Sequence, residues 1–269
     1  MKHDHHKSRF HDHQHAVEFD QRAAKSEIRV QLGEKLVEAL NLSGAECVLD
    51  LATGTGRFAH PVSRHLESGR IVGLDEALAM LRVGQEQTEP IRSYFQAAGN
   101  AEQIPFKSDV FDRAFVCFSL HHFGAPLLVA KEILRVLKLG GIFAVVDPIL
   151  KEARDTVDEA LNERVNQVFR RTHGENFRFQ TGTSIRDLLS EAGFRIARFD
   201  LPTFAFDQEG MEGIPTGRHW LEAAEGLADG PPELAERFGQ NYLRWEKKGQ
   251  TVRVFGSFPY ALICGEKPG

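Results

Sequence analysis

Apolar residues recur along the chain at two spacings. Short continuous apolar runs are typical of strands that are buried on both faces, and apolar positions three or four residues apart indicate helices. The strands expected on this basis span 47–52, 70–74, 94–97, 111–120, 142–146, 194–199 and 252–263. The expected helices span 20–40, 58–66, 77–83, 127–137, 157–169 and 184–192, with further helical pieces at 220–227 and 233–245.

Strands and helices alternate up to about residue 150, which predicts βαβ units and an α/β fold with a parallel sheet. Gly44 and Gly193 fit helix exits, and Ser184 with Asp187 resembles a capping box. The stretch 207–250 is rich in glycine, proline and acidic residues, and we interpret it as a helical cap inserted on the sheet. We therefore expect a single domain over 19–269, preceded by a tail over 1–18.

The tail contains half of the chain's histidines, at positions 3, 5, 6, 11, 13 and 15. The alternation of His11, His13 and His15 could present imidazoles to a metal ion. Histidines without a fixed scaffold define no coordination geometry, however. We interpret the segment as a flexible polar tail and expect no metal site.

Composition narrows the function classes. The formal net charge is -5 and basic residues form no long run, which disfavours nucleic acid as a partner. No apolar run approaches the roughly 18–20 residues that span a bilayer, and the polar N-terminus does not resemble a signal peptide. Cys47, Cys117 and Cys264 are scattered singly in apolar surroundings, as buried hydrophobes would be. These features favour a cytoplasmic protein without membrane insertion, either a monomer or a homodimer.

The loop after the first strand is the most informative stretch. The sequence VLDLATGTGRFA at 48–59 runs from a buried strand through two glycines into a helix, and Gly54-x-Gly56-x-x-Ala59 satisfies a dinucleotide fingerprint. A carboxylate at Asp50 would repel a pyrophosphate and would suit a ligand with an ammonium or sulfonium group. Asp75 ends the second strand, where it can accept hydrogen bonds from ribose hydroxyls or cap the next helix.

Taken together, five segments resemble the class I S-adenosylmethionine-dependent methyltransferases, and in particular the ubiquinone/menaquinone-biosynthesis branch. They are DLATGTG (50–56), GLD (73–75), GNAEQIPF (99–106), FDRAFVCFSLHH (111–122) and EILRVLKLGG (132–141). The resemblance covers about residues 45–150. It implies a Rossmann-like, mainly parallel seven-stranded sheet whose last strand is antiparallel, with helices on both faces.

The resemblance also implies cofactor contacts. The methionine part would be lined by Asp50, Ala52, Thr53, Gly54, Gly56, Ser119 and Leu120. The ribose would be held by Asp75, with Glu76 beside it, and the adenine would contact Met80, Asn100 and Ala101. Three positions depart from the family pattern: Asn100 replaces a common Asp, Ala52 a frequent Gly, and Leu139 the usual Pro.

Methyl transfer needs a base only when the acceptor arrives protonated. His121 and His122 follow a strand at the carboxyl edge of the sheet, where one could act as that base or merely pack. Asp147 is placed similarly. Phe19, Arg22 and their helix could cover the cofactor. In the cap, an aromatic lid or simple packing would involve Phe204, Phe206, Arg218, His219, Trp220, Tyr242 and Trp245.

The function expected is methyl transfer from S-adenosylmethionine to O, N or C of a small-molecule acceptor. Three alternatives stay open at this point. They are an NAD(P)-dependent oxidoreductase, a non-catalytic S-adenosylmethionine-binding protein, and an RNA or protein methyltransferase, which the acidic charge balance disfavours.

Overall fold

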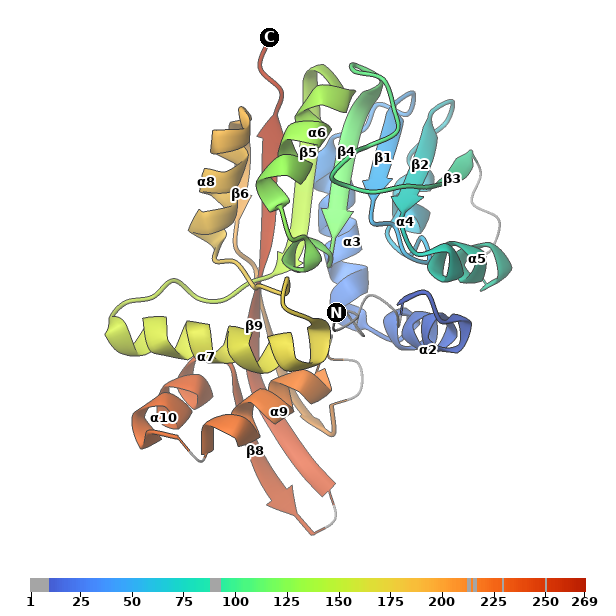
Figure 1. Ribbon diagram of the computed structural model, residues 1–269. Coiled ribbons are helices and arrows are strands. Elements are labelled where there is room, and N and C mark those ends of the chain that lie inside the picture. The colour runs from blue at the N-terminus through green and yellow to red at the C-terminus, as the bar shows by residue number, and fades with distance from the viewer. Residues whose placement is uncertain (1–9, 88–92, 212–213, 215–216, 229, 250) are drawn as a thin grey trace, which may run out of the picture.

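A twisted sheet forms the centre of the computed structural model, which describes residues 10–87, 93–211, 214, 217–228, 230–249 and 251–269 (Figure 1). The strands are β1 (Cys47–Leu51), β2 (Arg70–Asp75), β3 (Tyr94–Ala98), β4 (Phe111–Cys117), β5 (Leu137–Pro148), β6 (Arg195–Asp200), β7 (Thr203–Glu209), β8 (Leu243–Lys248) and β9 (Thr251–Glu266). The main path runs β3-β2-β1-β4-β5-β9-β6. Its first five strands are parallel, and β9 is antiparallel to both β5 and β6, as expected.

The strand count differs from the expected seven, because β7 and β8 also pair with β9. β9 is 16 residues long, and its first part leaves the main sheet to pair with these two strands. The predicted helical piece over 233–245 overlaps the first three residues of β8. That helix instead ends at Asn241.

Helices cover both faces of the sheet because successive strand residues point to opposite sides. Val48 packs toward α3 (Glu27–Leu40) and α4 (Ala59–Ser63), whereas Leu49 packs toward α6 (Pro126–Val136) and α8 (Gly182–Ala192). The short helix α5 (Leu78–Gln87) lies beside β2 and β3. The Arg70–Asp75 strand and the 126–136 helix match their predicted positions within two residues.

The N-terminal segment differs from the prediction. Residues 13–18, assigned to the flexible tail, belong to α2 (His13–Ala24), whose N-cap Asp12 accepts a hydrogen bond from the His15 backbone N–H at 2.8 Å. His3, His5 and His6 lie outside the described residues. The predicted single helix over 20–40 is broken by Ser26, whose side chain caps α3.

Two predicted caps were wrong. Helix α3 ends at Leu40 with Asn41 as its C-cap, in the left-handed conformation, so Gly44 lies beyond the helix exit. Helix α8 is capped by Thr181, whose Oγ1 accepts from the Ser184 N–H. Gly193 does end α8, with a left-handed φ of 107°.

The cap lies beyond the carboxyl ends of the central strands (Figure 1). It comprises α7 (Thr156–His173), β7, α9 (Gly217–Ala228), α10 (Pro232–Asn241), β8 and the first part of β9. Its interior is a closely packed aromatic cluster, which is formed by Phe169, Phe177, Phe179, Trp220, Phe238, Tyr242 and Phe258. The cap core therefore continues the hydrophobic core on the α3 side of the sheet.

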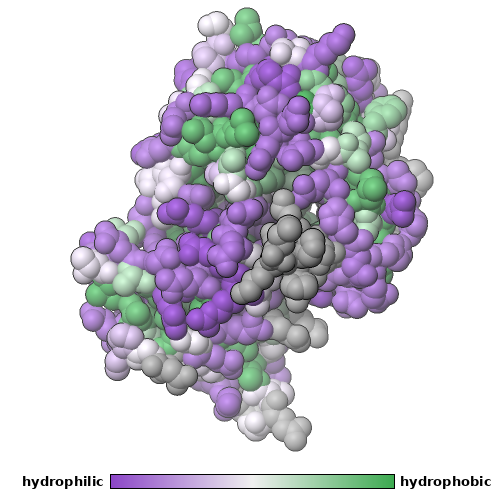
Figure 2. All heavy atoms as spheres, in the orientation of Figure 1, coloured by the Kyte–Doolittle hydropathy of each residue, from purple (hydrophilic) through white to green (hydrophobic). Residues whose placement is uncertain are grey.

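The surface in Figure 2 is mostly polar, with small separate apolar areas. Across the described residues, no helix has the length and apolar character that crossing a membrane requires. Cys47, Cys117 and Cys264 carry buried thiols, as predicted.

Candidate active site

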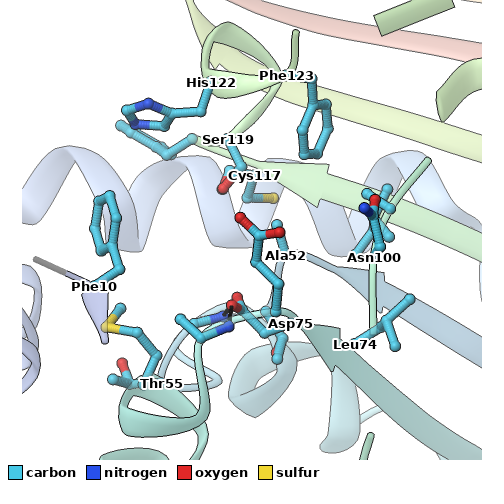
Figure 3. A pocket seen from close by; sticks show the side chains of 18 of the residues that line it. Phe10, Ala52, Thr55, Leu74, Asp75, Asn100, Cys117, Ser119, His122 and Phe123 are labelled. Carbon is cyan, nitrogen blue, oxygen red and sulfur yellow. Dashed lines mark hydrogen bonds between the residues drawn. The ribbon is translucent and has the colours of Figure 1, made fainter. Parts of the chain in front are cut away.

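A pocket opens at the carboxyl ends of β1, β2 and β4 (Figure 3). Its walls come from four regions of the chain: the loop after β1, the end of β2 with the start of α5, the segment 99–102, and the segment 117–124 after β4. Phe10, His11 and Phe19 of the N-terminal segment also line it, as do His173 and Asn176 from the cap side. The site thus lies between the sheet, α2 and the cap, where open α/β sheets bind their ligands.

The loop after β1 turns sharply through residues with positive φ. Ala52, Gly54 and Gly56 have φ of 53°, 56° and 80°. Alanine is therefore held in a left-handed conformation where the methyltransferase pattern frequently has glycine. Ala52, Thr53 and Gly54 line the pocket, but Gly56 does not.

Three backbone N–H groups of this loop already donate within the protein. The N–H of Thr53 donates to Leu74 O at 3.1 Å, that of Gly54 to Asp75 Oδ2 at 2.7 Å, and that of Gly56 to Thr53 O at 2.9 Å. A dinucleotide loop needs such groups to face the pyrophosphate. The hydrogen bonding of this loop therefore disfavours a phosphate ligand.

Asp75 is held rigidly at the rim of this loop. Besides the Gly54 contact, its Oδ1 accepts from the Ala77 N–H at 2.8 Å. Burial raises the pKa of Asp75. The carboxylate lines the pocket, in a fixed orientation and with acceptor capacity left for a hydroxyl-bearing ligand (Figure 3).

Asp50 does not line the pocket, contrary to expectation. It is 1% exposed, and Thr53 Oγ1 donates to its Oδ2 at 2.5 Å. Thr53 Oγ1 also lies 2.8 Å from the hydroxyl of Tyr94. Burial raises the pKa of Asp50 to about 8. The Asp50 carboxyl therefore does not contact a ligand in the pocket directly. It can act on one through its hydrogen bond with Thr53 or electrostatically, with Thr53 lying between them.

Of the other predicted cofactor residues, some line the pocket and one does not. Five of them line the pocket: Glu76, Met80, Asn100, Ala101 and Ser119. The side chain of Asn100 is oriented by accepting the Glu102 N–H at 2.7 Å. Leu120 is buried in the core on the α6 side and does not reach the pocket.

The two adjacent histidines have different surroundings. They lie in the short 3-10 helix η1 (Leu120–His122). His121 is buried, its Nδ1 lies 2.8 Å from Asp147 Oδ2, and neither residue of this pair lines the pocket. His122 does line it (Figure 3). The expectation that His121 or Asp147 meets a ligand directly is therefore not supported by their placement.

Comparison with known proteins places the chain in a family. A family model for a methyltransferase domain matches residues 49–145. A malonyl-[acyl-carrier protein] O-methyltransferase from Marinomonas sp. is 33% identical over 242 residues, which cover 87% of this chain and 85% of the relative. The chain is a class I S-adenosylmethionine-dependent methyltransferase.

Two further similarities agree with this membership. A demethylmenaquinone methyltransferase from Staphylococcus saprophyticus is 23% identical over 175 residues, which cover 60% of this chain and 75% of the relative. A geranyl diphosphate methyltransferase solved in complex with S-adenosylmethionine has a TM-score of 0.57 at 13% identity, covering 88% of this chain and 84% of that one, and shows the shared fold. The cofactor of the methyltransferase is S-adenosylmethionine. The oxidoreductase and the non-catalytic alternatives are overturned.

Sequence reasoning did not identify Arg29 as a residue of the pocket of this methyltransferase. Arg29, on α3, lines the pocket with its guanidinium carbon 4.2 Å from the centre of the Phe118 ring and 5.5 Å from that of Phe19. Among the described residues, its side chain makes no ion pair or hydrogen bond. Burial lowers its pKa to about 10. No local pattern marks an arginine on an amphipathic helix as a pocket residue.

The contact between α2 and the glycine loop was also missed. Asp20 is fully buried, and its Oδ1 accepts from Thr55 Oγ1 and from Arg57 Nε, both at 2.7 Å. Phe19 lines the pocket, as the expectation of a covering helix requires, whereas Arg22 does not. The ion pair with Arg57 holds α2 against the loop and so closes one side of the methyltransferase pocket.

Of the two alternatives for the cap aromatics, an aromatic lid or simple packing, their placement favours packing. Trp220 and Tyr242 are buried in the cap core, and Phe204, Phe206 and Trp245 pack against that core without lining the pocket. His219 contacts His173 but is likewise absent from the lining. The side chain of Arg218 lies outside the described ones. In the part of the chain that the structure describes, no group of three or more His, Cys, Asp and Glu side chains could hold a metal ion.

Proposed function

We propose that this methyltransferase transfers the methyl group of S-adenosylmethionine to a small-molecule acceptor that binds in the same pocket. The observation that carries the proposal is the division of the lining. One part matches the cofactor motifs around β1, β2 and residues 99–102, and the other is formed by Phe10, His122, Phe123, His173 and Asn176. This second part lies between the N-terminal segment and the cap, a position that suits a compact acceptor.

In this proposal, Asp75 accepts hydrogen bonds from the ribose hydroxyls, and Asn100 with Ala101 binds the adenine edge next to Met80. Arg29 pairs with the carboxylate of the methionine part. It suits this role because it lines the pocket and, among the described residues, has no carboxylate partner of its own. Bound there, the cofactor supplies an activated methyl group. The protein aligns the acceptor for in-line attack and excludes water.

The names of the relatives support different acceptors. One acts on demethylmenaquinone and another on malonyl-[acyl-carrier protein]. The formal charge of -5 and the enclosed position of the pocket favour a small molecule over RNA.

Thermal unfolding with S-adenosylmethionine, S-adenosylhomocysteine, NAD or no ligand tests cofactor binding. A ligand at about 100 times its dissociation constant adds roughly 2.7 kcal/mol of stability if it binds only the native state. We expect a shift with the first two ligands that Asp75→Ala weakens, and none with NAD.

Transfer of a tritiated methyl group then distinguishes the acceptor classes. We expect counts in small organic acceptors. Transfer only to RNA or to protein would contradict the proposal.

A further inference from the structure

Tyr94 reaches the loop after β1 from the edge of the sheet, although it does not line the pocket. It is the first residue of β3, and β2 lies between β3 and β1. A Cβ added at Gly73 of β2 would collide with the Tyr94 hydroxyl, and one added at Gly56 would lie 3.1 Å from it. Two positions without a side chain therefore leave the room in which this hydroxyl meets the loop.

The hydroxyl begins a series of three hydrogen-bonded groups, Tyr94, Thr53 and Asp50, which we call the hydroxyl relay. Tyr94 Oη lies 2.8 Å from Thr53 Oγ1, and Thr53 Oγ1 lies 2.5 Å from Asp50 Oδ2. An ionised carboxyl can only accept hydrogen bonds, so in that state Thr53 gives its one hydrogen to Asp50. The Tyr94 hydroxyl must then donate to Thr53. Burial raises the pKa of Tyr94, so its hydroxyl keeps this hydrogen near neutral pH.

The hydroxyl relay stabilises the ionised form of Asp50 more than the protonated form. A hydrogen bond that involves a charged group is roughly twice as strong as one between neutral groups, and hydrogen bonds in series polarise one another. Tyr94 thus offsets part of the burial that raises the pKa of Asp50 to about 8. Among the described residues, the titratable groups that interact electrostatically with Asp50 come from three strands: Asp75 of β2, Tyr94 of β3 and Cys117 of β4.

The methyl donor and its product differ in charge at the sulfur. S-adenosylmethionine carries a positive sulfonium, whereas S-adenosylhomocysteine has a neutral thioether. Thr53 lines the pocket and lies against Asp50, so a ligand charge acts on Asp50 across one side chain. An opposite charge nearby favours the ionised carboxyl, and this coupling is reciprocal. A group that helps Asp50 to ionise therefore helps the cationic ligand to bind.

We propose that Tyr94 is a positioning residue that makes the pocket prefer the cationic methyl donor to its neutral product. It acts through Thr53 on Asp50 and touches neither ligand. The inference rests on the proposed function, because it places the methyl donor in this pocket. Such a preference limits inhibition by the product, which shares the nucleoside and the amino-acid part of the donor.

Calorimetric titration of the full chain with each ligand at pH 7 tests the proposal. Tyr94→Phe removes only the hydroxyl. We expect the affinity for S-adenosylmethionine, divided by that for S-adenosylhomocysteine, to fall roughly two- to fivefold, because the ionised carboxyl loses more than the protonated one. Tyr242→Phe removes a buried hydroxyl from the cap core and is the matched control, which should keep the wild-type ratio.

The pH dependence of this ratio identifies the carboxyl through which Tyr94 acts. At each pH, the ratio is divided by that of Asp50→Asn, which cancels the titration of the ligands themselves. In the wild type, the corrected ratio should rise with pH and level off above about 8, where Asp50 is ionised without a ligand. In Tyr94→Phe the same rise should occur at higher pH, because the protonated form of Asp50 is then favoured.

A double variant tests whether the effect passes through Asp50. Tyr94→Phe combined with Asp50→Asn should have the ratio of Asp50→Asn alone. A further fall would show that the hydroxyl acts by another route and would overturn the proposal. If Tyr94→Phe fails to fold, Thr53→Val interrupts the same hydroxyl relay and should lower the ratio at least as far; an unchanged ratio there would overturn the proposal too.

The remaining outcomes separate this inference from the proposed function. A loss of affinity by the same factor for both ligands in Tyr94→Phe would mean a structural role only, and so would an equal fall of the ratio in Tyr242→Phe. Either result would overturn the inference alone. Failure of the wild type to bind either ligand would contradict the proposed function, and the inference would fall with it.

Discussion

The charge of Arg29 offers a prediction in which ligand affinity and protein stability respond differently. The guanidinium lies against Phe118 in the pocket with no anionic partner among the described residues. Replacement by methionine keeps the apolar stem and removes the charge. A charge-assisted hydrogen bond to a carboxylate contributes about 1.5–3 kcal/mol. Arg29→Met should therefore weaken binding of S-adenosylhomocysteine roughly 10- to 150-fold.

Calorimetric titration with a truncated ligand separates this effect from a structural one. The compound 5′-methylthioadenosine lacks the amino-acid part of S-adenosylhomocysteine, and its affinity should change less than about twofold, because it has no carboxylate to lose. The unliganded variant should unfold within about 1 kcal/mol of the wild type, since the lost cation–π contact is offset by relief of a desolvated charge. Equal losses of affinity for both ligands, or no loss for either, would refute the assignment.

Three further perturbations test the surroundings of the pocket. Burial raises the pKa of Asp50 to about 8, so this carboxyl is mostly protonated at pH 7. Binding of the cationic cofactor should lower that pKa and release part of a proton, which calorimetry in two buffers detects; equal release from Asp50→Asn would contradict this. Asp20→Asn leaves the part-exposed Arg57 without its partner and should reduce the free energy of unfolding in urea by about 3 kcal/mol; a change below about 0.5 kcal/mol would be inconsistent with the ion pair. In Gly73→Ala, the new Cβ would collide with the Tyr94 hydroxyl and lie 2.8 Å from Thr53 Cγ2. Thr53 lines the pocket and would have to shift, so affinity for S-adenosylhomocysteine should fall at least about tenfold although no lining residue is replaced; unchanged affinity in a calorimetric titration would contradict this.

The parallel half of the fold was predictable because its strands are buried on both faces. Val48 and Leu49 are each fully buried, on opposite sides of the sheet, so the apolar run in the sequence is continuous. The cap strands gave no such signal. The strand β7 alternates exposed and half-buried residues over only seven positions, and β8 is mostly charged.

The site was predictable where a residue's role follows from its place at a strand end. Asp75 is such a residue. The position of Asp50 was misjudged because the loop folds Thr53 over its carboxyl group, a contact that depends on backbone dihedrals. Consecutive residues can also diverge completely, since His121 points into the core while His122 lines the pocket. Arg29 and His173 reach the site through tertiary packing, which spacing along the chain does not reveal.

The central claim is that the pocket at the ends of β1, β2 and β4 holds the methyl donor by its nucleoside and its amino-acid part. A crystal structure of the complex with S-adenosylhomocysteine tests it most directly. The account predicts ribose hydroxyls within hydrogen-bond distance of the Asp75 carboxylate, and the ligand carboxylate against the Arg29 guanidinium. A ligand bound elsewhere, or one whose ribose does not contact Asp75, would contradict it.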